Sequence, residues 1–86
     1  MELEKQIYET IVKRLDINEE DLEGFTYDTP FYDRGDGQAN LGLDSIDALE
    51  MVTILYDTFE IDVPTEDMRK LYSVNAIAEY IREKGQ

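Results

Sequence analysis

The sequence predicts an all-α protein, a bundle of three longer helices and one short helix with a long loop between the first two helices. Apolar residues recur at helical spacing in three separate stretches, near residues 2–15, 45–60 and 74–84. Residues that favour the start of a helix precede the second and third of these stretches. The length of 86 residues suits one small domain, so we expect residues 1–86 to form a single domain.

The composition restricts the partners and the chemistry of this chain. Its 21 acidic residues outnumber the 8 basic residues and give a formal net charge of -13, which disfavours nucleic acid and anionic membranes and favours a basic protein surface. No cysteine or histidine is present, so the chain lacks a disulfide, a thiolate and the commonest general base. Its start lacks the features of a signal peptide and no apolar run could span a membrane, so we expect a cytoplasmic protein without membrane insertion.

In the first helix, predicted over residues 2–15, Glu2 and Glu4 lie in the first turn, as the helix dipole favours. Its apolar face recurs every four positions and contains Leu3, Ile7, Ile11 and Leu15. The connection from Asp16 to Leu43 is rich in residues that interrupt helices, and a connection of this length is usually packed or functional. Its expected anchors to the core are Leu22, Phe25, Phe31 and Tyr32.

The second helix, predicted over residues 45–60, begins with a strong capping pattern. Asp44 suits the N-cap position, and Asp47 stands three residues later, where its carboxylate can bond the amide of the cap residue. Ser45 therefore occupies the first helical position, with its hydroxyl expected in solvent beside free amides and the positive end of the helix dipole. This environment favours a phosphate group, including one attached covalently to Ser45.

The second helix is apolar on more than one side. Helical periodicity directs one set of side chains toward the core: Ala48, Met51, Val52, Leu55 and Phe59. A second stripe is expected in solvent and contains Asp47, Glu50, Thr53, Asp57 and Glu60. Ile46 projects onto this acidic stripe, which makes it a candidate apolar contact for partner proteins.

Two further helices complete the predicted bundle. The short helix is expected from about Glu66 to Tyr72 with Thr65 as its cap, and a helix of two turns depends on packing rather than on intrinsic propensity. Ser73 is the expected cap of the last helix, which ends near Gly85. The inner face of the last helix contains Val74, Ile77, Ala78 and Ile81.

The residues around Ser45 form a recognisable motif. The run Leu41-Gly42-Leu43-Asp44-Ser45-Ile46-Asp47, followed by Leu49-Glu50-Met51-Val52, resembles the signature of acyl carrier proteins. The resemblance continues through Leu55, Phe59, the Val63-Pro64 pair and residues 74–81, so it covers nearly the whole chain. It implies a helical bundle of acyl-carrier-protein type in which Ser45, flanked by Asp44 and Asp47, carries 4′-phosphopantetheine. The thiol of this arm would hold acyl groups as thioesters, so the chain would be a carrier and not an enzyme.

The resemblance also implies partners and binding surfaces. The partners would be a phosphopantetheinyl transferase and ketosynthases, reductases, dehydratases and acyltransferases with basic docking patches, and the carrier is expected to be a monomer. They would bind the acidic face of the second helix, at Asp44, Asp47, Glu50 and Asp57, with Ile46 as an apolar contact. An acyl pocket would lie among Val52, Leu55, Phe59, Val63, Leu71 and Ile77.

Some residues depart from the usual pattern of this family. Thr53 and Tyr56 replace the methionine and glutamate that are common in members serving fatty acid synthesis, and residues 34–40 are expected to form an extra surface turn. The pathway therefore stays open between fatty acid synthesis and a specialised polyketide or aryl-polyene-type pathway. A peptidyl or D-alanyl carrier remains an alternative, as does an acidic helical adaptor that is never modified.

Two rival functions fit the residues poorly. The segment from Asp33 to Gln38 resembles a calcium loop only superficially, because Gly35 and Gly37 occupy ligand positions and Gln38 replaces the required glycine, so no metal site is expected. Ser45 has no histidine to activate it and lies outside a Gly-x-Ser-x-Gly motif, so catalysis by Ser45 is not expected.

Overall fold

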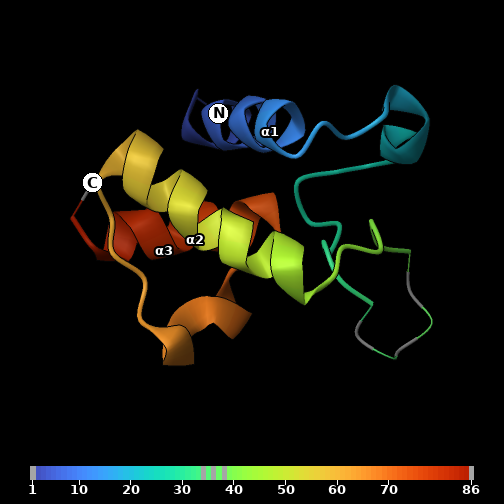
Figure 1. Ribbon diagram of the computed structural model, residues 1–86. Helices are drawn as coiled ribbons and strands as arrows, with labels where there is room; N and C mark the ends of the chain where they lie inside the picture. The colour runs from blue at the N-terminus through green and yellow to red at the C-terminus, as the bar shows by residue number, and fades with distance from the viewer. Residues whose placement is uncertain (1, 34, 36, 38, 86) are drawn as a thin grey trace.

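The part of the chain that the computed structural model describes, residues 2–33, 35, 37 and 39–85, is helical and contains no strand. In order, its elements are α1 (Glu2–Arg14), the 3-10 helix η1 (Glu19–Leu22), α2 (Ser45–Phe59), the 3-10 helix η2 (Thr65–Lys70) and α3 (Val74–Glu83) (Figure 1). The predicted all-α class with three longer helices is therefore confirmed. The predicted surface turn (residues 34–40) and the segment compared with a calcium loop (residues 33–38) both include Arg34, Asp36 and Gln38. These three residues lie outside the described residues.

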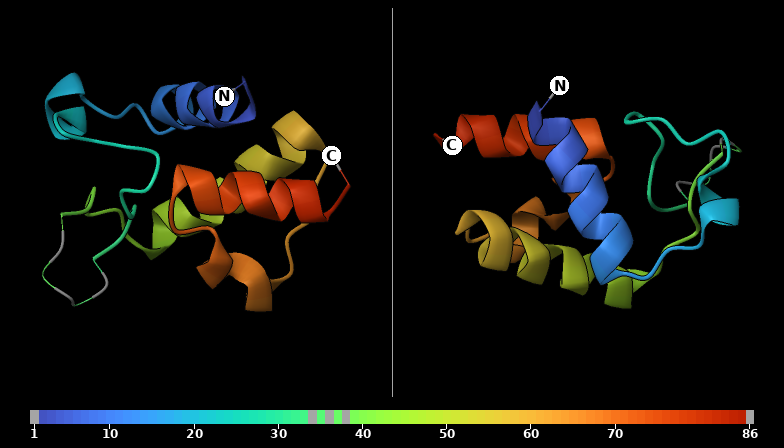
Figure 2. Two further views of the ribbon diagram at one scale, coloured as in Figure 1. Left: turned by 180° about the vertical axis from the view of Figure 1, so that it is seen from behind. Right: turned by 90° about the horizontal axis from the view of Figure 1, so that it is seen from above.

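The three α-helices form the body of the bundle. α1 contacts both α2 and α3, and Figure 2 shows it lying across these two helices. η2 lies on the opposite side of the bundle from α1 and contacts α3. No helix in the described ranges is both long enough and apolar enough to cross a membrane. The buried core contains Ile7 and Ile11 from α1, Met51, Ile54 and Leu55 from α2, and Ile77, Ala78 and Ile81 from α3.

The buried face of α2 is wider than the sequence predicts. Ile54 is 1% exposed, although the predicted inner face omits it. α2 packs under α1 as well as against the rest of the core, so its buried side exceeds a single helical stripe. Val52 and Phe59, which were predicted to face the core, are only partly buried but pack against it.

The short helix also differs from its prediction. It is a 3-10 helix from Thr65 to Lys70 rather than a helix from Glu66 to Tyr72. Thr65 is not its cap, because Pro64 occupies that position and no side chain caps the element. Instead, the amide of Asp67 donates to the carbonyl of Pro64 at 2.9 Å, a bond between residues three apart that closes the turn. η1, within the predicted connection, was not predicted.

The connection between α1 and α2 is held against the bundle. Phe31 is fully buried, its amide donates to the carbonyl of Tyr72 (2.8 Å), and its carbonyl accepts from the amide of Leu43 (2.9 Å). Phe25 and Tyr32 pack against the core, so these three predicted anchors are confirmed. Because Leu43 directly precedes Asp44, the N-cap residue of α2, the anchoring of Phe31 also positions the start of that helix.

A charged residue of α1 lies inside the bundle. Glu4 is 1% exposed, and its two oxygens accept hydrogen bonds from Arg82 of α3, at 2.9 Å from Nη1 and 3.1 Å from Nη2. These bonds lower the pKa of the Glu4 carboxyl, because they stabilise its charged form. The pair joins the start of α1 to the end of α3, across 78 positions of sequence.

Raising the salt concentration at neutral pH is expected to raise the melting temperature of this protein. The formal net charge of -13 lies on only 86 residues, and like charges oppose the compact state. Salt weakens this repulsion, with a Debye length of about 10 Å at 0.1 M. Melting curves by circular dichroism over a series of sodium chloride concentrations measure the effect. A melting temperature that stays flat or falls would contradict the view that net charge limits stability.

Candidate functional site

α2 begins at a capping box that fixes the position of Ser45. Oδ1 of Asp44 accepts the amides of Ile46 (3.0 Å) and Asp47 (3.1 Å), and Oδ2 of Asp47 accepts the amide of Asp44 (3.2 Å). The predicted N-cap and capping box are therefore confirmed. One detail of the prediction is wrong, because the amides of Ile46 and Asp47 are bonded to Asp44 and are not free beside Ser45.

Ser45 is the accessible one of the two serines in the sequence. It is exposed at the first position of α2, and the bonds of the capping box do not use its hydroxyl. Ser73 is only 2% exposed, and its Oγ accepts the amide of Ala76 (3.1 Å), which confirms it as the cap of α3. An enzyme that modifies a serine of this folded chain can therefore reach Ser45 but not Ser73.

A cavity of about 310 Å³ opens beside Ser45. Its walls come from the loop before α2, from the first turn of α2 and from η2. Its volume lies at the lower end of the range for small-molecule sites, about 300–1,000 Å³, and its walls are mostly apolar. A flexible chain attached to Ser45 can therefore lie along these walls, so the residues fit a covalently attached arm. The lining residues are Tyr32, Leu43, Asp44, Ser45, Ala48, Met68 and Arg69.

The Tyr32 hydroxyl in this cavity remains protonated near neutral pH. Burial, and to a smaller extent the charge of Asp47, raises the pKa of Tyr32 to about 12. The sequence assigned Tyr32 only to the core and gave no role to Met68 or Arg69. These residues lie on segments distant from Ser45 in sequence, and the fold brings them together.

The six residues predicted to form an acyl pocket lie in or against the core. Leu55, Val63, Leu71 and Ile77 are buried, and Val52 and Phe59 pack against them. None of the six lines the cavity beside Ser45. An acyl pocket among these side chains therefore stays a prediction.

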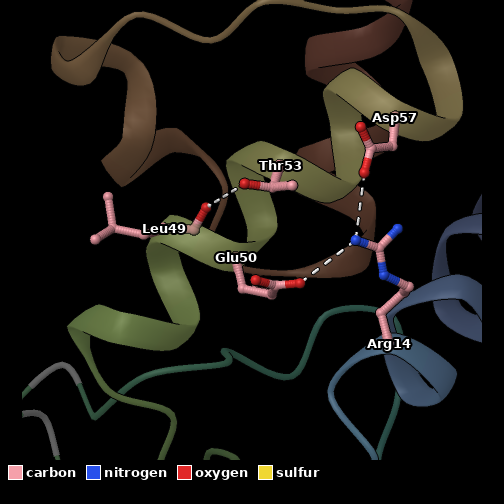
Figure 3. Close-up of polar contacts among 5 residues, drawn as sticks. All are labelled: Arg14, Leu49, Glu50, Thr53 and Asp57. Atoms are coloured by element: carbon pink, nitrogen blue, oxygen red, sulfur yellow. Dashed lines mark hydrogen bonds and ion pairs between the residues drawn. The ribbon is translucent and has the colours of Figure 1, made fainter.

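Arg14, at the end of α1, pairs with two acidic residues of α2. Its Nη2 lies 3.4 Å from Oε1 of Glu50 and 3.4 Å from Oδ2 of Asp57 (Figure 3). All three side chains are partly exposed, so each ion pair contributes only about 0.2–1 kcal/mol. The sequence did not predict this pairing with Arg14, which arises because α1 crosses α2 at these residues. We call Glu50 and Asp57 the acidic pair.

Beside the acidic pair, α2 exposes three large apolar side chains, Ile46, Leu49 and Tyr56, which we call the apolar stripe. They are 73%, 60% and 61% exposed, and their spacing of three and seven residues places them on one side of the helix. Figure 3 shows Leu49 pointing away from the acidic pair. The predicted exposure of Ile46 is confirmed, whereas Leu49 and Tyr56 were not assigned to this surface. Clustered apolar side chains in solvent are typical of a surface that contacts partners.

These features define a helical carrier domain, in which a bundle presents an accessible serine at a fixed helix start beside a cavity that can receive an attached chain. The family described as "Phosphopantetheine attachment site" matches residues 36–81, over half of the chain. The chain belongs to this family. Members of the family are carriers rather than catalysts, and their cofactor is covalently attached 4′-phosphopantetheine.

A comparison with a curated relative agrees with this assignment. The chain is similar to an acyl carrier protein of Bdellovibrio bacteriovorus, with 38% identity over 47 residues. The similar region covers 55% of this chain and 60% of that relative, so it spans less than two thirds of the length of the relative.

Proposed function

We propose that this chain carries acyl intermediates as thioesters on a 4′-phosphopantetheine arm attached to Ser45. It presents them to enzymes of fatty acid synthesis or of a related polyketide or aryl-polyene-type pathway. The observation that carries the proposal is the accessible Ser45, fixed at the first position of α2 by the capping box and bordering the cavity. The chain orients the arm, and the partner enzymes perform the reactions.

The residues around Ser45 explain why attachment needs a separate transferase. A serine hydroxyl is a weak nucleophile without a general base, and the sequence contains no histidine to act as one. The carboxylates of Asp44 and Asp47 bond backbone amides and hold the start of α2. A phosphopantetheinyl transferase therefore supplies the base and binds coenzyme A, which donates the arm to the serine oxygen and leaves as adenosine 3′,5′-bisphosphate. The arm brings the thiol that this cysteine-free chain lacks.

Partner enzymes are proposed to dock on α2, over the apolar stripe and the acidic pair. The apolar stripe offers area that is favourable to remove from water. The acidic pair offers charge for a basic patch, which competes with Arg14 for Glu50 and Asp57. Asp44 and Asp47 contribute negative charge at the start of α2 while remaining bonded to backbone amides.

Glu50→Lys is expected to slow loading by a phosphopantetheinyl transferase several-fold at low salt and by less at high salt. The substitution removes one member of the acidic pair and places a second cation next to Arg14. Electrostatic steering of a basic partner weakens as salt screens it, so the defect should shrink with ionic strength. Initial rates from intact-mass spectra at two salt concentrations measure the effect.

The matched control is Glu9→Lys on the exposed side of α1, which makes the same change in net charge away from α2. Equal slowing by Glu9→Lys would assign the effect to net charge and contradict the docking surface. Leu49→Ala tests the apolar stripe separately, and it is expected to slow loading with little dependence on salt because the lost contact is apolar.

The proposed acyl role is tested by the group that the arm accepts. The arm-bearing chain, incubated with malonyl-coenzyme A and a malonyltransferase, is expected to gain a malonyl group. Hydroxylamine, which cleaves thioesters, is expected to release this group. Acceptance of an amino acid from an adenylating enzyme, without acceptance of malonyl, would identify a peptidyl or D-alanyl carrier instead. The proposed location is the cytoplasm, where coenzyme A is available, and the proposed state is a monomer.

A further inference from the structure

The cavity beside Ser45 contains one positively charged lining residue, Arg69. The sequence has no lysine or arginine between Gly35 and Met68, so Arg69 is the first cation after a long acidic stretch. Among the described residues, no carboxylate forms an ion pair with Arg69, whereas the adjacent Lys70 pairs with Asp67. In this part of the chain Arg69 is thus a guanidinium without an acidic partner that lines the same cavity as Ser45.

The contacts of η2 explain why Arg69 is available. Its nearest acidic neighbour in sequence, Asp67, accepts a hydrogen bond from the hydroxyl of Tyr80 (2.7 Å) and pairs with Lys70 (3.4 Å). The bond from Tyr80 is also the main cause of the lowered pKa of Asp67, so this carboxylate stays charged and bound to Tyr80 and Lys70. These contacts fix η2 against α3, and Arg69 of η2 is one of the residues that line the cavity.

The first turn of α2 needs a cation if a phosphate is attached to Ser45. The carboxylates of Asp44 and Asp47 lie on the same turn, and like charge disfavours a phosphate there. The amides of Ile46 and Asp47, which could otherwise offset that repulsion, already donate to Asp44. A guanidinium offers several donors in a planar fork that matches phosphate oxygens.

We propose that Arg69 binds the phosphodiester that joins the arm to Ser45, and thereby directs the arm into the cavity between Tyr32 and Met68. The inference rests on the proposed function of Ser45. The phosphodiester is the part of the arm nearest to the Oγ of Ser45, so it lies beside the cavity that both Ser45 and Arg69 line.

The test uses the ¹⁵N-labelled chain before and after loading, with intact mass confirming that the arm is attached. The Nε–Hε signal of Arg69, assigned by its loss in Arg69→Gln, is expected to move downfield on loading because a charged acceptor has joined it. The ³¹P signal of the loaded chain is expected to shift in Arg69→Gln. Lys70→Gln, which removes the adjacent positive charge outside the cavity, should leave the ³¹P signal unchanged.

Three results would overturn the inference. The Arg69 signal could stay in place on loading, or Lys70→Gln could shift the ³¹P signal as much as Arg69→Gln does. The third result is a shift of the Arg69 signal that appears only when the arm carries malonyl and not when it carries acetyl or a free thiol. That result would mean that Arg69 binds the carboxylate of the acyl group rather than the phosphodiester. Failure of the chain to gain the mass of the arm at all would contradict the proposed function itself, and intact mass separates that outcome from the other three.

Discussion

Replacing Ser45 with alanine is expected to abolish attachment of phosphopantetheine while leaving the fold intact. The Ser45 hydroxyl is exposed, and the capping box at the start of α2 is formed by Asp44 and Asp47 without it. Alanine also has the highest helix propensity of any residue, so the first turn of α2 should persist. Intact mass after incubation with coenzyme A and a phosphopantetheinyl transferase measures loading, and circular dichroism measures folding.

Ser73→Ala is the matched control, because it removes the other serine of the chain. Ser73 accepts the amide of Ala76 at the start of α3, so its loss is expected to cost about 0.5–2 kcal/mol of stability without preventing loading. The two substitutions therefore have opposite expected effects on loading and stability. A mass gain in Ser45→Ala equal to that of the wild type would show that attachment occurs elsewhere.

Arg82→Met is expected to lower the free energy of unfolding by about 1.5–3 kcal/mol, the range for hydrogen bonds to charged groups. The substitution leaves the Glu4 carboxylate buried without its two bonds. Arg82 itself is partly exposed, so the effect should fall below the loss of about 3–5 kcal/mol that is typical of breaking a fully buried pair. Denaturant unfolding at neutral pH measures the change.

The same pair predicts a dependence on pH. The pKa of Glu4 is lowered in the folded state, so the pair stabilises the fold above the ordinary glutamate pKa of 4.5, and this stabilisation is lost as the pH falls through the lowered value. The difference in stability between wild type and Arg82→Met should therefore shrink below pH 4.5. Lys5→Met, which removes an exposed positive charge next to Glu4, should change stability by no more than about 0.5 kcal/mol. A constant difference across this pH range, or an equal cost for Lys5→Met, would contradict the role of the pair.

Local signals in the sequence predict the start of α2 correctly. The capping box joins Asp44 and Asp47, which are three residues apart, so its bonds follow from short-range geometry alone. The same holds for Ser73 at the start of α3. The position of Ser45 depends on these local bonds, which is why its place at the start of α2 could be predicted without the fold.

Other features depend on how the helices cross, and the sequence could not predict them. Glu4 fits the first turn of a surface helix, yet it is buried because Arg82, 78 positions away, lies across from it. The pairing of Arg14 with Glu50 depends in the same way on the position of α1 over α2. Arg69 borders the cavity only because η2 folds back beside the start of α2.

The most direct test of the account is to locate the modification on the wild-type chain. The chain is incubated with coenzyme A and a phosphopantetheinyl transferase, digested, and sequenced by tandem mass spectrometry. The account predicts one phosphopantetheine group on the peptide that contains Ser45, at Ser45, and none on the peptide that contains Ser73. An unmodified chain, or a group attached to any residue other than Ser45, would contradict it.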